Sequence, residues 1–287
     1  MVGERLGLLF RTVRHLKPRQ VVNRLTRRWV GTPRLTDAPP IRVQGVRLSI
    51  PPAAAPVSYL GGHRFRFLND ERRVPTSEYG SPKDGLLWDY NFHYFDGLAA
   101  PEPDPEAKQA WIADWLDHVP VGSRPAWDPY PTSRRILNWI LWALDSGSPL
   151  PQGAEASLAG QVRHLERRLE FHLMANHLLA NAVALTAAGA WFGGDEGEGW
   201  LHAGSKLLRQ ELGEQFHADG GHYELSPTYH ALILRDLLHL LQIARGTGCR
   251  PVEGIIEDVA RRAADWLVAM RRPDGRLPLF NDAAYDQ

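Results

Sequence analysis

Beyond residue 105, apolar residues recur every three to four positions, which is the pattern of amphipathic helices. The spacing predicts seven helices of similar length, joined by short or medium loops. We expect them at 106–118, 132–145, 154–171, 176–192, 198–214, 227–245 and 254–271. Ser226 followed by Pro227 suits the first turn of one of them. Seven such helices indicate stacked antiparallel hairpins.

Two further features complete the predicted fold. The helical pairs show no strict sequence repeat, which favours a toroid over a solenoid of identical modules. Residues 40–75 include stretches that alternate apolar and polar side chains, as strands do. We therefore expect a mainly α protein, an incomplete (α/α) toroid of antiparallel helical hairpins with a small N-terminal β-element. The expected parts are a basic helical arm at 1–38, the β-element at 39–80 and the toroid at 81–287.

Charge and composition exclude several classes of partner. Lys+Arg and Asp+Glu both number 33, so no net field attracts nucleic acid or an acidic polymer over long range. No run approaches the roughly 20 apolar residues that span a bilayer, and charges interrupt the N-terminal runs before a signal-peptide core forms. The single cysteine, Cys249, excludes an internal disulfide and a cysteine-based metal site. We expect no nucleic-acid partner, no transmembrane segment and no metal site.

Four segments are richer in polar and aromatic residues than packing requires. They are 127–135, 176–177, 219–230 and 274–282. The first three stand at the starts of the second, fourth and sixth predicted helices, and the last follows the seventh. Because every second junction of an up-down array lies at the same end, the four segments should converge on one face. Polar groups and aromatic rings at one mouth are what a ligand cleft requires.

These segments resemble a known family. Residues 176–192, which begin with Asn-His, and Glu-Leu-Ser-Pro-Thr-Tyr-His at 224–230 are similar to the heparinase II/III and alginate lyase superfamily. The run Leu-Trp-Asp-Tyr-Asn-Phe-His-Tyr-Phe-Asp at 87–96 and the block at 130–139 resemble members found among bacterial exopolysaccharide genes. The likeness covers roughly residues 60–287.

The resemblance implies a polysaccharide lyase that cleaves an acidic, uronate-containing polysaccharide by β-elimination. The difficult step is removal of the C5 proton, because the neighbouring carboxylate charge opposes carbanion formation. A donor held against that carboxylate can be worth about 3 kcal/mol. By resemblance, Asn176 supplies this contact and His177 is a donor or proton-transfer group. Tyr229 is the general acid for the leaving O4, and a second role as base stays open.

Other residues are candidates for substrate contact. A phenolic base needs positive charge nearby, because the reference pKa of tyrosine is near 10. Arg134, Arg135 or His177 could supply that charge, and the two arginines could alternatively bind a uronate or sulfate in bidentate fashion. The remaining candidates are Trp88, His93, Tyr94, Trp127, Tyr130, Glu224 and His230.

Several roles have structural alternatives. Asn176 could only cap a helix, His177 could be a buried histidine with its hydrogen bonds made, and Glu224 could brace the site from behind. Trp88 and Trp127 fit the hydrophobic core as well as they fit a sugar platform.

Two other functions stay open. The first is a glycoside hydrolase whose acid and base come from carboxylates such as Asp128, Asp219, Glu224 or Asp282. The second is a non-catalytic module for glycan binding or exopolysaccharide biosynthesis. The resemblance also implies a β-sandwich domain beyond a segment like 274–282, which usually adds a catalytic histidine or tyrosine and often a zinc ion. We expect no cofactor in this chain and an acidic polysaccharide or oligosaccharide as its ligand, with the β-sandwich as a partner outside this sequence.

Overall fold

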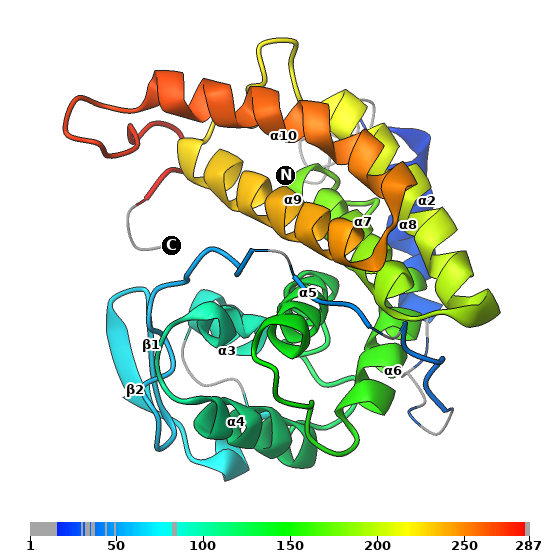
Figure 1. The fold of residues 1–287 in the computed structure, drawn as a ribbon, viewed down its shortest axis with the longest axis vertical. Coiled ribbons are helices and arrows are strands. Elements are labelled where there is room, and N and C mark those ends of the chain that lie inside the picture. Colours follow the sequence, from blue (N-terminus) through cyan, green and yellow to red (C-terminus); the bar gives the residue numbers. More distant parts are fainter. Residues whose placement is uncertain are drawn as a thin grey trace, which may run out of the picture.

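The computed structural model describes residues 16–29, 31, 35, 38–43, 45–48, 50–81 and 85–284. Helices dominate this part of the chain, with one small sheet beside them (Figure 1). The helices are α2 (Pro18–Thr26), α3 (Leu86–Tyr94), α4 (Pro105–His118), α5 (Pro129–Asp145), α6 (Ala154–Glu166), α7 (Ala175–Trp191), α8 (Gly194–Gln215), α9 (Pro227–Thr247) and α10 (Arg250–Met270). The strands are β1 (Arg64–Phe67) and β2 (Asp70–Arg73).

All seven helices predicted after residue 105 are present, as α4 to α10. The prediction of a mainly α fold is therefore confirmed. The clearest boundary error is the end of α6, which stops at Glu166 instead of residue 171. The helix ends early because the chain turns back, and the Glu170 amide donates to the Asn181 side chain on α7 (2.8 Å). Helix α3 was not predicted, since aromatic and polar residues cover all its faces and leave no apolar stripe.

The N-terminal β-element is smaller than predicted. β1 and β2 form an antiparallel hairpin in which Arg64 pairs with Arg73, and its two-residue turn is Leu68-Asn69, both with positive φ. The alternating stretch at 41–50 is not a strand in its described residues, which contain one isolated bridge between Arg42 and Phe192. Leu48 of this stretch packs against the hydrophobic core, whereas Ile41 and Ile50 are exposed.

The N-terminal arm packs on the helical body where it is described. Lys17 forms an ion pair with Glu214 of α8, and the Asn23 side chain donates to the Leu169 carbonyl (3.1 Å). Residues 1–15 of the predicted arm lie outside the described residues. The division at 38/39 and 80/81 stays a prediction. No helix in the described part of the chain has both the length and the apolar character needed to span a bilayer.

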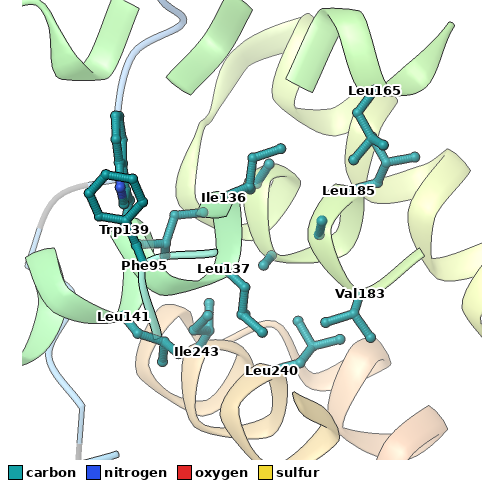
Figure 2. Packing of buried hydrophobic residues seen from close by; sticks show 14 of the residues in the cluster. Phe95, Ile136, Leu137, Trp139, Leu141, Leu165, Val183, Leu185, Leu240 and Ile243 are labelled. Carbon is teal, nitrogen blue, oxygen red and sulfur yellow. The ribbon is translucent and has the colours of Figure 1, made fainter. Parts of the chain in front are cut away.

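The hydrophobic core holds α5, α7 and α9 together. Ile136 and Leu137 of α5 pack near Val183 of α7 and Leu240 of α9 (Figure 2). Helix α7 is central, and α8 approaches it closely because glycine occupies the contact. A Cβ at Gly189 would lie 2.2 Å from the Leu201 nitrogen, so no larger residue fits. This packing fixes where the first turns of α5, α7 and α9 lie.

Candidate functional site

A cleft of about 230 Å³ opens where the first turns of α5, α7 and α9 meet α3. Its lining includes six of the residues singled out in the sequence. They are Tyr94, Tyr130, Arg134, Asn176, His177 and Tyr229. The structure thus brings together the starts of alternate helices, as the up-down arrangement predicts. The segment 274–282 approaches the start of α9 without lining the cleft, since Asn281 donates to the Leu225 carbonyl (2.7 Å).

The start of α7 is an unusual backbone turn. Met174 and Ala175 have φ values of 63° and 53°, a region that non-glycine residues rarely adopt and that costs roughly 1–3 kcal/mol per residue. Helix α7 begins at Ala175, with Met174 as its N-cap, so Asn176 lies inside the helix and does not cap it. Instead, the carboxylate of Glu224 accepts a hydrogen bond from the backbone amide of Asn176 (2.9 Å). This bond ties the start of α7 to the loop before α9.

His177 is held from behind by a buried carboxylate. Its Nδ1 lies 3.2 Å from Oε1 of Glu170, which is almost fully buried. The other oxygen of Glu170 accepts from the Asn181 side chain (3.1 Å). Because the carboxylate accepts, it favours the proton on Nδ1 and leaves Nε2 as the nitrogen available to a ligand. The His177 side chain is 34% exposed, so it is not a fully buried core histidine.

Tyr229 enters the cleft from the first turn of α9. Ser226 is the N-cap, and its hydroxyl accepts from the Tyr229 amide (3.4 Å). The preceding residue, Leu225, has a φ of 56°. Both loops that deliver the key side chains therefore end in left-handed backbone before their helices begin.

Three further tyrosines form a neutral wall of the cleft. Burial raises the pKa of Tyr90 and of Tyr130 to about 12, and that of Tyr94 well above its usual value. All three phenols therefore stay protonated near neutral pH. Tyr94 and Tyr130 offer hydroxyl groups and ring faces to a sugar without adding charge, whereas the Tyr90 hydroxyl donates to Asp128 (2.9 Å).

Arg134 is engaged by the protein's own carboxylates. One end of its guanidinium donates to Asp236 and the other to Asp96 Oδ1, at 2.8 Å in the second case. Burial opposes ionisation of Asp96, but Arg134, Arg235 and the hydrogen bond from Asn138 outweigh it and hold the pKa of Asp96 well below its ordinary value. The predicted bidentate grip of Arg134 on substrate is not supported, since both ends of the fork are occupied.

Arg135 is a structural residue, contrary to the prediction that it contacts substrate. It is fully buried and donates to Gln161 (2.8 Å) and to the carbonyls of Ala126 (2.9 Å) and His93 (3.1 Å). Its guanidinium lies 4.2 Å from the Trp115 ring centroid. Burial lowers its pKa to about 9.

Four other residues predicted to contact substrate are buried and do not line this cleft. Trp127 is 2% exposed and Trp88 5%, so neither indole offers a face to a sugar there. His93 accepts a hydrogen bond from Trp115 (3.0 Å), and the His230 ring donates to the Ala263 carbonyl (2.9 Å). Burial holds the pKa of His93 well below its usual value. Glu224 acts through Asn176 and is likewise absent from the lining.

The carboxylates named for a hydrolase are not gathered at the cleft. Asp128 is bonded to Arg124 (2.8 Å) and to the Tyr90 hydroxyl (2.9 Å), and Asp219 accepts from the Gly221 amide (2.9 Å). Neither of these, nor Glu224 or Asp282, lines it. Among the described residues, no group of three or more His, Cys, Asp or Glu side chains is placed to hold a metal ion.

Some lining residues escaped the sequence reasoning. Tyr90 and Asn91 line the cleft with Tyr94, and these positions share one face of α3. Had residues 87–96 been recognised as a helix, the residues on that face would have been chosen as site candidates instead of Trp88 and His93. Asp96 and Arg235 carry no local signal, because only the packing of α9 on α5 brings them together.

Comparisons with known proteins agree with this architecture. Residues 155–287 match the family described as heparinase II/III N-terminus. A heparin-sulfate lyase of Bacteroides stercoris is 29% identical over 169 residues, covering 56% of this chain and 25% of the relative. One of Bacteroides thetaiotaomicron is 27% identical over 117 residues, covering 38% of this chain and 17% of the relative.

Solved structures share the fold. A crystal structure of heparinase III aligns with a TM-score of 0.59 at 18% identity, over 98% of this chain and 48% of the other. The heparan sulfate lyase HepC of Pedobacter heparinus aligns with a TM-score of 0.52 at 17% identity, over 92% and 45%. The chain thus spans a quarter or less of its curated relatives and just under half of these structures. The predicted helical toroid is confirmed, and residues 155–287 are similar to the heparinase II/III N-terminus family.

Proposed function

We propose that this chain is the sugar-binding part of a polysaccharide lyase that cleaves an acidic, uronate-containing polysaccharide by β-elimination. The observation that carries the proposal is the presence of Asn176, His177 and Tyr229 in one cleft. Relatives that are heparin-sulfate lyases support the same reaction class. The neutral tyrosine wall is suited to stacking and hydrogen bonding with sugar rings.

In this proposal, Asn176 acts on the substrate carboxylate. Its side-chain amide donates a hydrogen bond to the uronate whose C5 proton is removed. The bond strengthens as negative charge moves onto the carboxylate, so it stabilises the transition state more than the ground state. The strained turn at Met174 and the hydrogen bond from the Asn176 backbone amide to Glu224 hold the residue in place before substrate arrives.

His177 and Tyr229 then move the protons. Nε2 of His177 takes the C5 proton, and the carboxylate of Glu170 stabilises the imidazolium that forms. The electrons of the C5–H bond form the C4–C5 double bond as the C4–O4 bond breaks. Tyr229 gives its hydroxyl proton to the leaving O4. In the alternative assignment, Tyr229 acts both as the base that takes the C5 proton and as the acid that protonates O4.

The test is the identity of the product. We would incubate the chain with a panel of uronate-containing polysaccharides, heparan sulfate among them, and measure near-ultraviolet absorbance alongside new reducing ends. Elimination predicts both signals together, and Tyr229→Phe should abolish them while sugar binding changes by less than about threefold. Reducing ends without absorbance would establish a hydrolase, and binding without either signal a non-catalytic module. Equal rates in Tyr229→Phe and the parent chain would remove Tyr229 from the mechanism.

A further inference from the structure

A cluster of four charged side chains lies beside the cleft, and all of them except Asp236 line it. It consists of Arg134, Arg235, Asp96 and Asp236. Two positive and two negative groups leave the cluster neutral in total. The two arginines are nevertheless held in very different ways.

Arg134 has its hydrogen bonds made within the protein. It donates to one oxygen of each aspartate and is only 4% exposed. Asp96 accepts a second bond from Asn138 (2.6 Å). Arg134 therefore bonds to both carboxylates but offsets only one of their two negative charges, and Arg235 supplies the second positive charge.

Arg235 lines the cleft without such bonds. Its Nη2 lies 3.5 Å from Asp96 Oδ2 and its Nε lies 3.8 Å from Asp236 Oδ1. Neither contact is a hydrogen bond, and both nitrogens are buried without an acceptor among the described residues. Buried guanidinium N–H groups normally have acceptors, because leaving one unpaired costs free energy. Arg235 is thus a loosely held cation in the lining of the cleft, 23% exposed, whose Nε and Nη2 lie near the two aspartates without bonding to them.

We infer that Arg235 is the anion-binding residue of this cleft and takes the carboxylate of a uronate. Its planar fork matches a carboxylate in bidentate geometry, and the charge-assisted bonds would replace two loose ion contacts. Arg134 stays bonded to both aspartates, so Arg235 is the cation left to meet an arriving carboxylate. The sugar class rests on the function proposed above, whereas the anion preference does not depend on turnover.

The test measures binding by calorimetry with the full chain. The probes are an unsulfated tetrasaccharide of alternating glucuronic acid and N-acetylglucosamine and its carboxyl-reduced form. Wild-type protein should prefer the acidic probe. Arg235→Gln should weaken its binding roughly ten- to hundredfold and leave the reduced probe within about twofold. Arg235→Lys should recover part of the loss, since it restores the charge but not the fork.

Two controls separate binding from folding and carboxylate from sulfate. Arg261→Gln, an exposed arginine of α10, should leave both affinities unchanged, and thermal melting should show that all variants fold. A carboxyl-reduced, N-sulfated tetrasaccharide should be insensitive to Arg235→Gln; an equal loss with that probe would overturn the assignment of a carboxylate.

The outcomes distinguish this inference from the proposed lyase. It is overturned if wild-type protein binds the acidic and reduced probes equally, or if Arg235→Gln keeps the preference. Should the preference depend on Arg235 while no unsaturated product forms with any polysaccharide, the binding assignment stands and the lyase function fails. If product forms but the preference survives in Arg235→Gln, the lyase stands and this inference fails.

Discussion

Two groups of aromatic residues occupy different regions of the molecule. Tyr94, Tyr130 and Tyr229 line the cleft, whereas Trp111 and Trp139 are wholly buried in the core. Trp111 stacks on Phe95 with ring centroids 4.1 Å apart, so its faces are already used. The aromatic residues of this chain therefore fall into two groups, and of these only the tyrosines of the cleft can meet a ligand there.

Helix α5 shows the difference within one element. Its first turn carries Tyr130 at the cleft, while Arg135 and Trp139, further along, are fully buried. Cleft substitutions should therefore change turnover or binding and leave stability alone. Core substitutions should do the reverse.

Asn176→Ala should have the largest effect. It removes the donor proposed for the substrate carboxylate, so kcat should fall about 100-fold, or roughly 3 kcal/mol in the barrier. The melting temperature should stay within a few degrees, because the backbone amide, not the side chain, bonds to Glu224. Steady-state kinetics with thermal melting provides the measurement. A large loss of stability with normal turnover would make Asn176 a structural residue.

Arg135→Met tests the core side of the comparison. The variant leaves the carbonyls of His93 and Ala126 without their donor, so the free energy of unfolding should fall by about 2–3 kcal/mol. Urea unfolding measures the loss, and Arg261→Met on the exposed face of α10 should change it by less than about 0.5 kcal/mol. If the Arg135→Met protein is stable but binds acidic sugar poorly, Arg135 contacts the ligand and is not only a core residue.

Glu170→Gln probes how the cleft depends on a residue behind it. The amide keeps the shape but removes the charge that orients His177 and stabilises its protonated form. We expect kcat to fall about tenfold with KM nearly unchanged. A change confined to KM would mean that His177 binds substrate and does not transfer a proton.

The smallest expected effect concerns His239, a buried residue of α9 whose effect on the free energy of unfolding should depend on pH. Burial lowers its pKa to about 4, and neither ring nitrogen has a hydrogen-bond partner among the described residues. An unfolded histidine titrates near 6.5, so between pH 6.5 and 4 the unfolded chain binds more protons and acid destabilises the fold. Denaturant unfolding of His239→Leu at pH 6 should show a gain of about 1 kcal/mol over the wild type, and little difference at pH 8. An equal difference at both pH values would contradict this origin.

The sequence predicted the elements better than the side-chain environments. Apolar periodicity located α4 to α10, and their up-down order implied that the starts of α5, α7 and α9 converge. Adjacent residues on a helix point about 100° apart, so Arg134 faces the charged cluster and Arg135 the core. That difference, and the position of Arg235 against Asp96, exists only once α5 and α9 are packed.

A crystal structure of the Tyr229→Phe variant with the unsulfated tetrasaccharide would decide whether this cleft is the sugar site. We predict sugar density between α3, α5, α7 and α9, with a uronate carboxylate within hydrogen-bonding distance of the Asn176 side chain. Sugar bound instead in the hollow beside Trp88 and His93, or a cleft left empty at saturating ligand, would contradict that assignment.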